Sequence, residues 1–293
     1  MMVNIMKPGF SVSKCAILAD YKDPEREAVI EAALKELLPE LSRVGISTEL
    51  FLNPNVETLC PKKDTDVFLV LGGDGSMIQF AGNLAHYNVP FYGMNYGNVG
   101  FMMNTLRHGL RYHAEKLKAG EFSTWSFPFL EVEATDQDGN KHHGHGLNDI
   151  YLQRMTPQSC KARVSIDTVP LRINPILCDG LIVATPLGST AYSYNITGSL
   201  VGIDTPVLTL TPIAAHRSCQ VSCMVLPQDT HIEFEILEPR KRRVQVVCDG
   251  TSHGDIIQAV VSLSSKRVSL CFDYKNSKHL TMRFLNKAFR RNR

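Results

Sequence analysis

The sequence predicts an α/β N-terminal domain with a mostly parallel, Rossmann-like sheet, followed by an all-β, sandwich-like C-terminal domain. Over the first 120 residues, apolar strand-like runs alternate with amphipathic helix-like stretches, which is the pattern of a parallel sheet covered by helices. One run, 67–71, is apolar throughout, as is typical of a strand buried on both faces. From about Phe122 short strand-like runs follow one another instead, which favours a sandwich.

The elements of the first domain, residues 1–121, follow from these runs. Pro24 opens the first helix, in which Val29, Leu37 and Leu41 recur at helical spacing. Because parallel strands are joined by right-handed crossovers, ligands are expected at the carboxyl ends of the strands. The expected strands are 15–19, 47–52, 67–71 and 90–94, and the expected helices are 24–41, 76–87 and 106–118.

The second domain, residues 122–272, is expected to consist of short strands separated by turn sequences such as 136–140. A C-terminal segment, 273–293, contains a helical stretch at 278–290 that can return to the first domain. The strands expected in the second domain are 129–134, 149–153, 164–166, 181–184, 207–211, 231–236, 244–247, 256–263 and 268–272.

Composition is that of an ordinary globular protein. Apolar residues make up 44% of the 293 residues and charged residues 20%, with a net charge of +2, which does not favour a nucleic-acid or membrane binder. The eight cysteines are scattered and form no Cys-x-x-Cys pair. The N-terminus lacks the apolar core of a signal peptide, and no apolar run is long enough to span a membrane. We therefore expect a cytoplasmic protein.

The most specific local signal is Gly72-Gly73-Asp74-Gly75, which lies between a buried strand and a helix. Its glycines let the backbone turn tightly and approach an anion, and the helix start offers free N–H groups to phosphates. A carboxylate beside phosphates is unfavourable unless it binds a cation or accepts a proton, so Asp74 is a candidate catalytic base. The alternative is a plain turn with Asp74 as the N-cap of the helix.

A second glycine-rich turn, 93–101, ends the next expected strand and would face the same crevice. Neither the P-loop sequence nor the Gly-x-Gly-x-x-Gly fingerprint is present. Phosphate binding would therefore depend on backbone groups and the aspartate, without a P-loop lysine.

Two further blocks follow the glycine turns, Asn148-Asp149 and 179–193 (DGLIVATPLGSTAYS), and together the four blocks resemble those of the NAD kinase family, in the family's order over residues 66–250. The turn Gly72-Gly73-Asp74-Gly75 alone is shared with diacylglycerol-type lipid kinases and phosphofructokinases, but the long block 179–193 is not, and it identifies the family. A weaker fifth block is Cys248-Asp249-Gly250. The four blocks are Gly72-Gly73-Asp74-Gly75, Gly93-x-Asn95-x-Gly97-x-x-Gly100-Phe101, Asn148-Asp149, and 179–193 (DGLIVATPLGSTAYS).

The resemblance implies a reaction and the residues that serve it. Asp74 would be the general base that takes the proton from the adenosine 2′-hydroxyl of NAD. The donor would be ATP with a divalent metal, Mg²⁺ or Mn²⁺, or inorganic polyphosphate as in some members. Family members are homo-oligomers whose NAD site borrows residues from a neighbouring subunit, so a tetramer is expected. The residues that would bind the donor and NAD are Gly72, Gly73, Gly75, Asn95, Phe101, Asn148, Asp149, Asp179, Thr190, Ala191, Tyr192, Ser193 and Asn195.

Residue chemistry agrees with these roles but leaves structural alternatives open. Asn148 can donate to and accept from an adenine edge, and the adjacent carboxylate can bind ribose hydroxyls. Equally, Asn148-Asp149 and Asp179-Gly180 have the composition of ordinary turns at strand starts, and Tyr192 that of a core aromatic.

The chain departs from the family pattern at three positions. Asp149 stands where the family usually has Glu, and Leu187 replaces a Ser or Thr. Leu177 stands where some members carry a basic residue linked to preference for NAD over NADH, so the redox form of the substrate is left open.

Two other functions are compatible with parts of the sequence. One is a lipid or sugar kinase with the same glycine turn, and the other is a dinucleotide-binding paralogue without catalytic activity. A separate group, His142, His143 and His145, could bind a metal, but the glycines around it favour an exposed turn.

Overall fold

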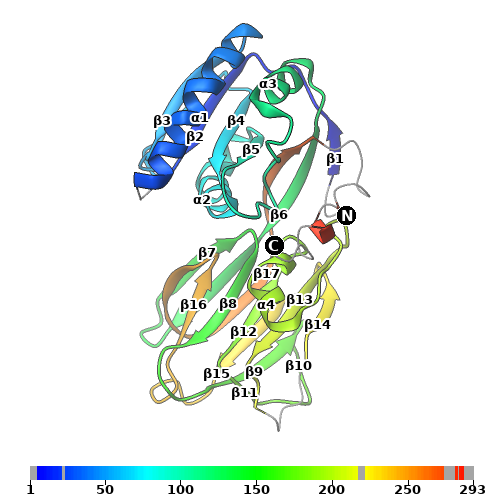
Figure 1. The fold of residues 1–293 in the computed structure, drawn as a ribbon. Coiled ribbons are helices and arrows are strands. Elements are labelled where there is room, and N and C mark those ends of the chain that lie inside the picture. Colours follow the sequence, from blue (N-terminus) through cyan, green and yellow to red (C-terminus); the bar gives the residue numbers. More distant parts are fainter. Residues whose placement is uncertain (1–4, 22–23, 217–221, 274–280, 283, 287–293) are drawn as a thin grey trace. The chain divides into compact units, whose positions relative to one another are not determined.

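In the computed structural model, parallel strands form the sheet of one half of the chain (Figure 1). The structure describes residues 5–21, 24–216, 222–273, 281–282 and 284–286. The parallel order is β3-β2-β4-β5, and the end of β17 pairs with β5. Their bounds are β2 Lys14–Ala19, β3 Ser47–Leu52, β4 Val67–Gly72, β5 Phe91–Asn95 and β17 Thr251–Phe272.

Helices pack against this sheet because their apolar residues recur every three or four positions. One core cluster joins Ile30, Leu37 and Leu41 of the first helix to Ile17 and Leu69 of the strands. The same cluster includes residues of α3, so α1 and α3 share one core with the sheet. The helices are α1 Pro24–Arg43, α2 Asp74–Leu84, the short η1 Ala85–Tyr87 and α3 Gly109–Ala119.

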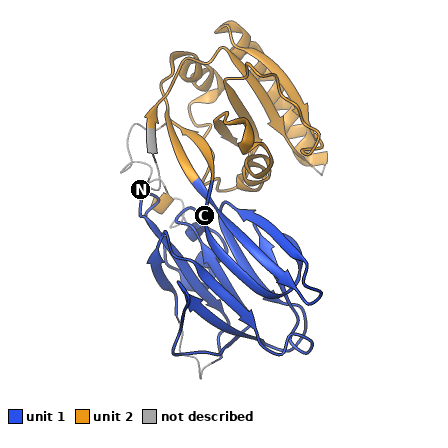
Figure 2. Cartoon of the chain, turned by 180° about the vertical axis from the view of Figure 1, so that it is seen from behind, with its two compact units in different colours: residues 1–3, 128–265 blue, residues 4–127, 266–293 orange. Residues whose placement is uncertain are grey.

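The chain divides into two compact units, shown in different colours in Figure 2. Unit 1 comprises residues 1–3 and 128–265, and unit 2 comprises residues 4–127 and 266–293. The divisions fall within two long strands, β6 (Ser123–Asp136) and β17. In unit 2, β1 (Ile5–Pro8) pairs antiparallel with the first part of β6.

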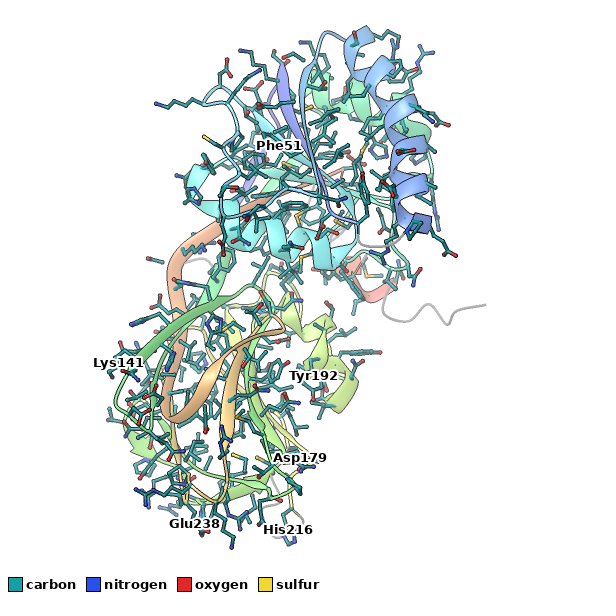
Figure 3. All side chains as sticks on the ribbon, turned by 90° about the vertical axis from the view of Figure 1, so that its left-hand side faces the viewer. Phe51, Lys141, Asp179, Tyr192, His216 and Glu238 are labelled. Atoms are coloured by element: carbon teal, nitrogen blue, oxygen red, sulfur yellow. The ribbon has the colours of Figure 1, made fainter. Side chains whose placement is uncertain are left out.

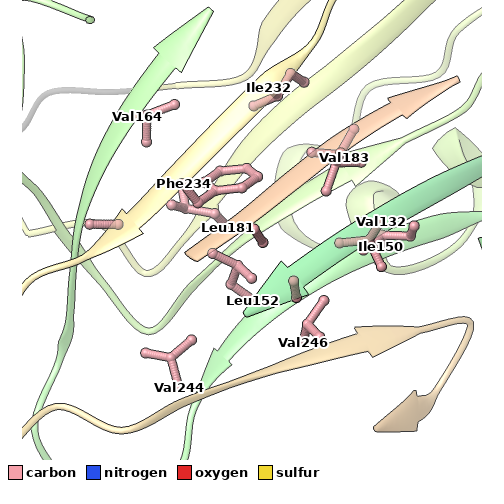
Figure 4. Close-up of a cluster of buried hydrophobic side chains, with 14 of the residues drawn as sticks. Val132, Ile150, Leu152, Val164, Leu181, Val183, Ile232, Phe234, Val244 and Val246 are labelled. Atoms are coloured by element: carbon pink, nitrogen blue, oxygen red, sulfur yellow. The ribbon is translucent and has the colours of Figure 1, made fainter. Parts of the chain in front are cut away.

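Unit 1 is built from antiparallel strands around its own core. In one sheet β12 pairs with β8 and β13, and in the other β9 pairs with β15 and β11. Figure 4 shows the buried side chains that these strands contribute, among them Leu152, Leu181 and Phe234. The remaining elements are β7 Lys141–Gly146, β8 Asp149–Arg154, β9 Cys160–Ile166, β10 Val169–Pro170, β11 Ile176–Cys178, β12 Gly180–Ala184, η2 Gly188–Thr190, α4 Tyr192–Thr197, β13 Val207–Ile213, β14 Met224–Pro227, β15 Ile232–Ile236 and β16 Val244–Cys248.

Most predicted elements of the first domain are confirmed, including strand 47–52 and helix 24–41, which ends two residues later than predicted. The predicted strands 256–263 and 268–272 are wrong as separate elements, because β17 runs unbroken through the polar residues between them. The domain boundary expected at residue 121 precedes β6, whereas the units divide inside it. Much of the predicted helix 278–290 lies outside the described residues, but 281–282 and 284–286 are helical.

The described residues also test two predictions from the sequence, one about membrane-spanning segments and one about the cysteines. No helix among them is long and apolar enough to cross a membrane. The seven cysteines that the description covers are all free thiols, and five of them are buried.

Candidate functional site

The glycine turn of unit 2 connects the end of β4 to the start of α2. Gly72 is the last residue of β4, Gly73 is the N-cap with extended backbone (φ −122°, ψ −169°), and Asp74 is the first residue of α2. The interpretation of Asp74 as an N-cap is therefore wrong, since Gly73 holds that position and no side chain caps the helix there. Gly75 follows in the first turn of α2, where the helix leaves backbone N–H groups free for an anion.

The Asp74 side chain is held by the backbone of the second glycine turn. Its Oδ2 accepts a hydrogen bond from the N–H of Phe101 (2.7 Å), and its Oδ1 accepts one from the N–H of Met102 (2.8 Å). Both carboxylate oxygens are thus fixed in direction, and the side chain is half-buried. Each oxygen retains a second lone pair, so the carboxylate can still accept a proton or contact a cation.

The second glycine turn lies directly against the first, as the sequence predicted for neighbouring parallel strands. β5 pairs with β4, and the N–H of Tyr96 donates to the carbonyl of Gly72 (2.8 Å). A Cβ added to Gly97 would lie 3.2 Å from the Cα of Gly73, so the two backbones are in van der Waals contact. Glycine at both positions permits this close approach.

Asn95 shapes the second turn from within. Its Oδ1 accepts the N–H of Gly97 (3.2 Å). Gly100 has φ +62°, and a Cβ there would lie 2.4 Å from the same oxygen. Beyond the turn, the Phe101 ring packs against that of Phe284, with centroids 5.7 Å apart. In this structure Asn95 and Phe101 therefore build the loop that orients Asp74.

In unit 1, the Asn148-Asp149 pair lies at the start of β8 and is held by a second aspartate. The Asp249 carboxylate accepts backbone N–H groups from Leu147 (2.5 Å), Asn148 (2.9 Å) and Asp149 (3.2 Å). Asp249 itself has φ +45°, a backbone conformation that Asp and Asn tolerate better than most residues. Asp249 belongs to the weaker fifth family block and is a site residue that was not predicted from the sequence.

The two carboxyl groups of this cluster are unequal. Burial, with a contribution from the nearby Asp249 carboxylate, raises the pKa of Asp149 to about 7. Burial also raises the pKa of Asp249, but its three amide donors act in the opposite direction by stabilising the anion. The amide donors of the cluster thus converge on the Asp249 carboxylate, and the pKa of about 7 places the protonation change of Asp149 near neutrality.

The residues that follow β12 hold the backbone of Asn148 in position by hydrogen bonds and close packing. Thr185 donates its N–H to the carbonyl of Asn148 (3.0 Å) and its hydroxyl to the carbonyl of Leu147 (2.9 Å). A Cβ on Gly188 would lie only 1.9 Å from the Asn148 carbonyl oxygen, so glycine is required there. Leu187 is buried, so the departure from Ser or Thr replaces a hydroxyl with an apolar side chain in the interior.

One atom of this cluster is left unsatisfied by the protein. Asn148 is 9% exposed, and its Oδ1 is buried without a hydrogen-bond partner among the described residues. Leaving a buried acceptor unpaired costs about 1–3 kcal/mol. A ligand with a polar N–H, such as an exocyclic amino group, would remove that cost.

Five further predicted residues of this unit lie at the end of η2, between η2 and α4, and on α4 itself. The Tyr192 ring meets that of Tyr151 edge-on, with centroids 5.3 Å apart. Ser193 is buried, and its hydroxyl lies 3.4 Å from that of Thr211, so it contributes to packing. The hydroxyl of Thr190 donates to the carbonyl of Leu187 (2.9 Å). Ala191 and the exposed Asn195 are joined through the backbone of the first turn of α4.

Asp179 lies apart from the Asn148-Asp149 pair. In the antiparallel register Ala184 is opposite Asp149, so Asp179, which directly precedes the other end of β12, is five residues or about 17 Å away at 3.3 Å per residue. Its carboxylate pairs with Arg154, whose Nε is 2.6 Å from Oδ1. Figure 3 shows Asp179 at the end of unit 1 that also carries His216 and Glu238, whereas Tyr192 lies on α4 away from that end.

The histidines expected in an exposed turn lie on strand β7, so the predicted turn is wrong, but His143 and His145 are exposed as expected. The strand pairs antiparallel with β6, with His143 opposite Glu133 and His145 opposite Glu131. The Nε2 of His142 lies 2.9 Å from the Asp136 carboxylate. Within the described parts of the chain, no group of three or more His, Cys, Asp or Glu side chains could hold a metal ion.

The fold and these residues define a class of protein with two units. The α/β unit carries a glycine turn that can bind phosphate, and the β-rich unit contains a buried cluster of carboxyl and amide groups. Residues 147–266 match the family model of the ATP-NAD kinase C-terminal domain. The NAD kinase of Rickettsia bellii is 34% identical over 217 residues, which are 74% of this chain and 83% of the relative. The NAD kinase of Caulobacter vibrioides is 36% identical over 228 residues, 78% of this chain and 85% of the relative. The chain belongs to the NAD kinase family.

Solved structures show the same fold at lower sequence identity. An NAD kinase from Archaeoglobus fulgidus in complex with ATP matches with a TM-score of 0.71 and 22% identity, covering 94% of this chain and 98% of its own. Yeast NADH kinase complexed with NADH matches with a TM-score of 0.72 and 23% identity, covering 94% and 87%.

Proposed function

We propose that this protein is an NAD kinase that transfers the γ-phosphoryl group of ATP to the 2′-hydroxyl of the NAD adenosine ribose. A new bond forms between the ribose 2′-oxygen and the γ-phosphorus, and the bond from that phosphorus to the β–γ bridging oxygen breaks. The products are NADP, ADP and a proton. The observation that carries the proposal is the Asp74 carboxylate, fixed by two backbone amides at a glycine turn where a helix begins.

Asp74 supplies the proton acceptor of this reaction. Phosphoryl transfer depends mainly on positioning and on stabilisation of charge, with one group to orient the attacking hydroxyl. The bonds from Phe101 and Met102 point the carboxylate in one direction, so the lone pairs that remain can accept the proton of the 2′-hydroxyl. Gly72, Gly73 and Gly75 present backbone to the phosphates, where the N-terminus of α2 favours negative charge.

A divalent metal, Mg²⁺ or Mn²⁺, is proposed to enter with the donor. Hard cations prefer oxygen ligands, and the Asp74 carboxylate retains lone pairs after accepting its two amide bonds. The residue therefore fits a cation carried by the phosphates. The ion would neutralise charge on the transferred group.

Asn148 and Asp149 are proposed to bind the adenosine of NAD. The unpartnered Oδ1 of Asn148 can accept the adenine amino group, and Asp149 can accept ribose hydroxyls when ionised. Thr190, Ala191 and Tyr192 would line the same pocket, with Asn195 at its exposed edge. Asp179 would serve the nicotinamide end.

We further propose that the protein forms a homo-oligomer, namely a tetramer. We also propose that it acts in the cytoplasm. The β-rich unit is the proposed contact surface. Sedimentation of the active protein tests this, and a monomer that is fully active at low concentration would contradict it.

The function is tested by incubating the purified chain with NAD, ATP and Mg²⁺ and measuring NADP with an NADP-specific dehydrogenase. We expect NADP to accumulate with time and with protein concentration. A protein that binds both substrates without forming NADP would be the non-catalytic paralogue instead.

A further inference from the structure

The loop that holds Asp74 leaves and rejoins the sheet at one point. Residues 95–104 leave the end of β5, and the N–H of Asn95 donates to the carbonyl of Asn104 (3.0 Å). The N–H of Asn104 in turn donates to the carbonyl of Gly93 (2.8 Å), and Asn104 forms an isolated parallel bridge with the same strand. Asn104 is therefore the residue at which the loop closes against β5.

The two amides that fix the Asp74 carboxylate lie close to this closing point. They belong to Phe101 and Met102, and Met102 is separated from Asn104 by a single residue. Because consecutive Cα atoms are held about 3.8 Å apart, a shift of Asn104 displaces these amides with it. The direction of the carboxylate thus depends on how firmly Asn104 is held.

The side chain of Asn104 ties the loop to the end of β17. It is fully buried, with 0% of the residue exposed. Its Nδ2 donates to the carbonyl of Cys271 (3.0 Å), and its Oδ1 accepts the N–H of Asp273, the residue after the strand (3.2 Å). A buried amide that bonds at both ends fixes the two segments against each other, because breaking it leaves buried donors and acceptors unpaired.

The end of β17 is a firm attachment point. Cys271 pairs with Tyr92 of β5 in parallel register. The carboxylate of Asp273 accepts the hydroxyl of Tyr92, and that hydroxyl oxygen lies 2.7 Å from Nδ1 of His113 on α3. Since Tyr92, His113 and Cys271 are fully buried, the strand end and the helix share one hydrogen-bonded interior.

We infer that Asn104 is a positioning residue for Asp74 and that the end of β17 is the fixed point from which it acts. The inference rests on the proposed function, in which Asp74 is the proton acceptor. Since Asn104 is fully buried, it acts through the loop and not by contact with a substrate. Its side chain sets the position of the loop backbone, and the amides of Phe101 and Met102 then set the direction of the carboxylate.

The test removes the two side-chain bonds while keeping the space filled. Asn104→Leu retains the branch at Cγ but can neither donate nor accept a hydrogen bond. The matched control is Ser123→Ala, since Ser123 is also buried and its hydroxyl also donates to the end of β17, at the carbonyl of Phe272 (3.3 Å). Ser123 lies on β6 and not in the loop. Each variant is made alone, and Asn104→Leu is also combined with Asp74→Asn.

Kinetics and amide hydrogen exchange are measured on the full chain. We expect Asn104→Leu to lower kcat about tenfold or more, because small displacements of catalytic groups have effects of this size, with the KM for NAD changed less than about threefold. Its Phe101 and Met102 amides should exchange faster than in the wild type. In the Asp74→Asn background the same change should lower kcat no further, since the group that it positions is absent. Ser123→Ala should lower Tm and leave kcat and the exchange of the loop near wild type.

A folded Asn104→Leu protein with kcat within about twofold of wild type would overturn the inference, as would an equal loss of kcat with and without the Asp74 carboxylate. The wild type provides a test that needs no variant. The amides of Phe101, Met102 and Asp273 should become exchangeable together, and loop amides that exchange freely while that of Asp273 stays protected would contradict the attachment. A wild type that forms no NADP would instead refute the proposed function, and the exchange measurements would still decide whether Asn104 holds the loop.

Discussion

Replacing Asp74 with Asn separates catalysis from structure at the glycine turn. The substitution keeps the shape of the side chain but removes its charge and one of its acceptor oxygens. In the wild type both oxygens accept backbone amides, from Phe101 and Met102. Asn can satisfy only one of these donors, because its NH₂ group would face the other N–H.

Two magnitudes follow from this geometry. The variant loses one of the two amide bonds, and the bond that remains is no longer strengthened by the charge of a carboxylate. Together these losses cost about 1–3 kcal/mol of stability and lower Tm by a few degrees. Loss of the proton acceptor lowers kcat by about 10²- to 10⁴-fold, which corresponds to roughly 3–5.5 kcal/mol of barrier. Because the proton moves only in the transition state, the KM for NAD should change far less than kcat.

The assay measures kcat, the KM for NAD and Tm on the same preparations. Asp66→Asn is the matched control, since one oxygen of Asp66 also accepts two backbone amides in unit 2, from Ser13 and Lys14, both at 2.8 Å. That variant should lose a comparable or smaller amount of stability and keep its kcat. A folded Asp74→Asn protein that turns over within a few-fold of wild type would refute the proposed role of Asp74.

Three further predictions concern the buried carboxyl pair and the metal. Since the pKa of Asp149 is raised from 3.8 to about 7, its contribution to stability is present below pH 3.8 and lost as pH rises towards 7, by about 4 kcal/mol at most. Thermal melts from pH 5 to 8 should therefore show a flatter pH dependence for Asp149→Asn, and an unchanged slope would contradict the assignment. Asp249→Asn should raise the KM for NAD about tenfold or more, because three charge-assisted amide bonds hold the loop of Asn148; a KM within twofold would exclude this positioning role. Removal of divalent ions with EDTA should abolish NADP formation and Mg²⁺ should restore it, whereas full activity in EDTA would exclude a metal.

Local features of the site could be predicted from the sequence because their causes are local. The run of glycines around Asp74 specifies a tight turn wherever a buried strand meets a helix. The approach of Gly97 to Gly73 followed from one further assumption, that consecutive parallel strands pair with each other. Both required only the periodicity of strands and the conformational freedom of glycine.

Features that depend on distant contacts could not be predicted in this way. The Asp249 carboxylate holds the backbone of residues about a hundred positions earlier in the chain, and no spacing rule relates them. The separation of Asp179 from Asp149 depends on the antiparallel register of β8 and β12, which short strands do not specify by pattern alone. The polar residues 264–267 separated two predicted strands, but β17 continues through them from its pairing with β15 to its pairing with β5, and Arg267 donates to Ser126 of β6 on the way.

Transfer of the γ-phosphoryl group of ATP to the 2′-hydroxyl of NAD can be followed with an isotopic label. The most direct measurement incubates the purified protein with NAD, Mg²⁺ and ATP labelled in the γ-phosphate, and follows the label by chromatography and phosphatase digestion. We expect labelled NADP whose label is released as phosphate from the 2′-position, in an amount equal to the ADP formed. Formation of ADP with the label recovered as free phosphate and no NADP would contradict it.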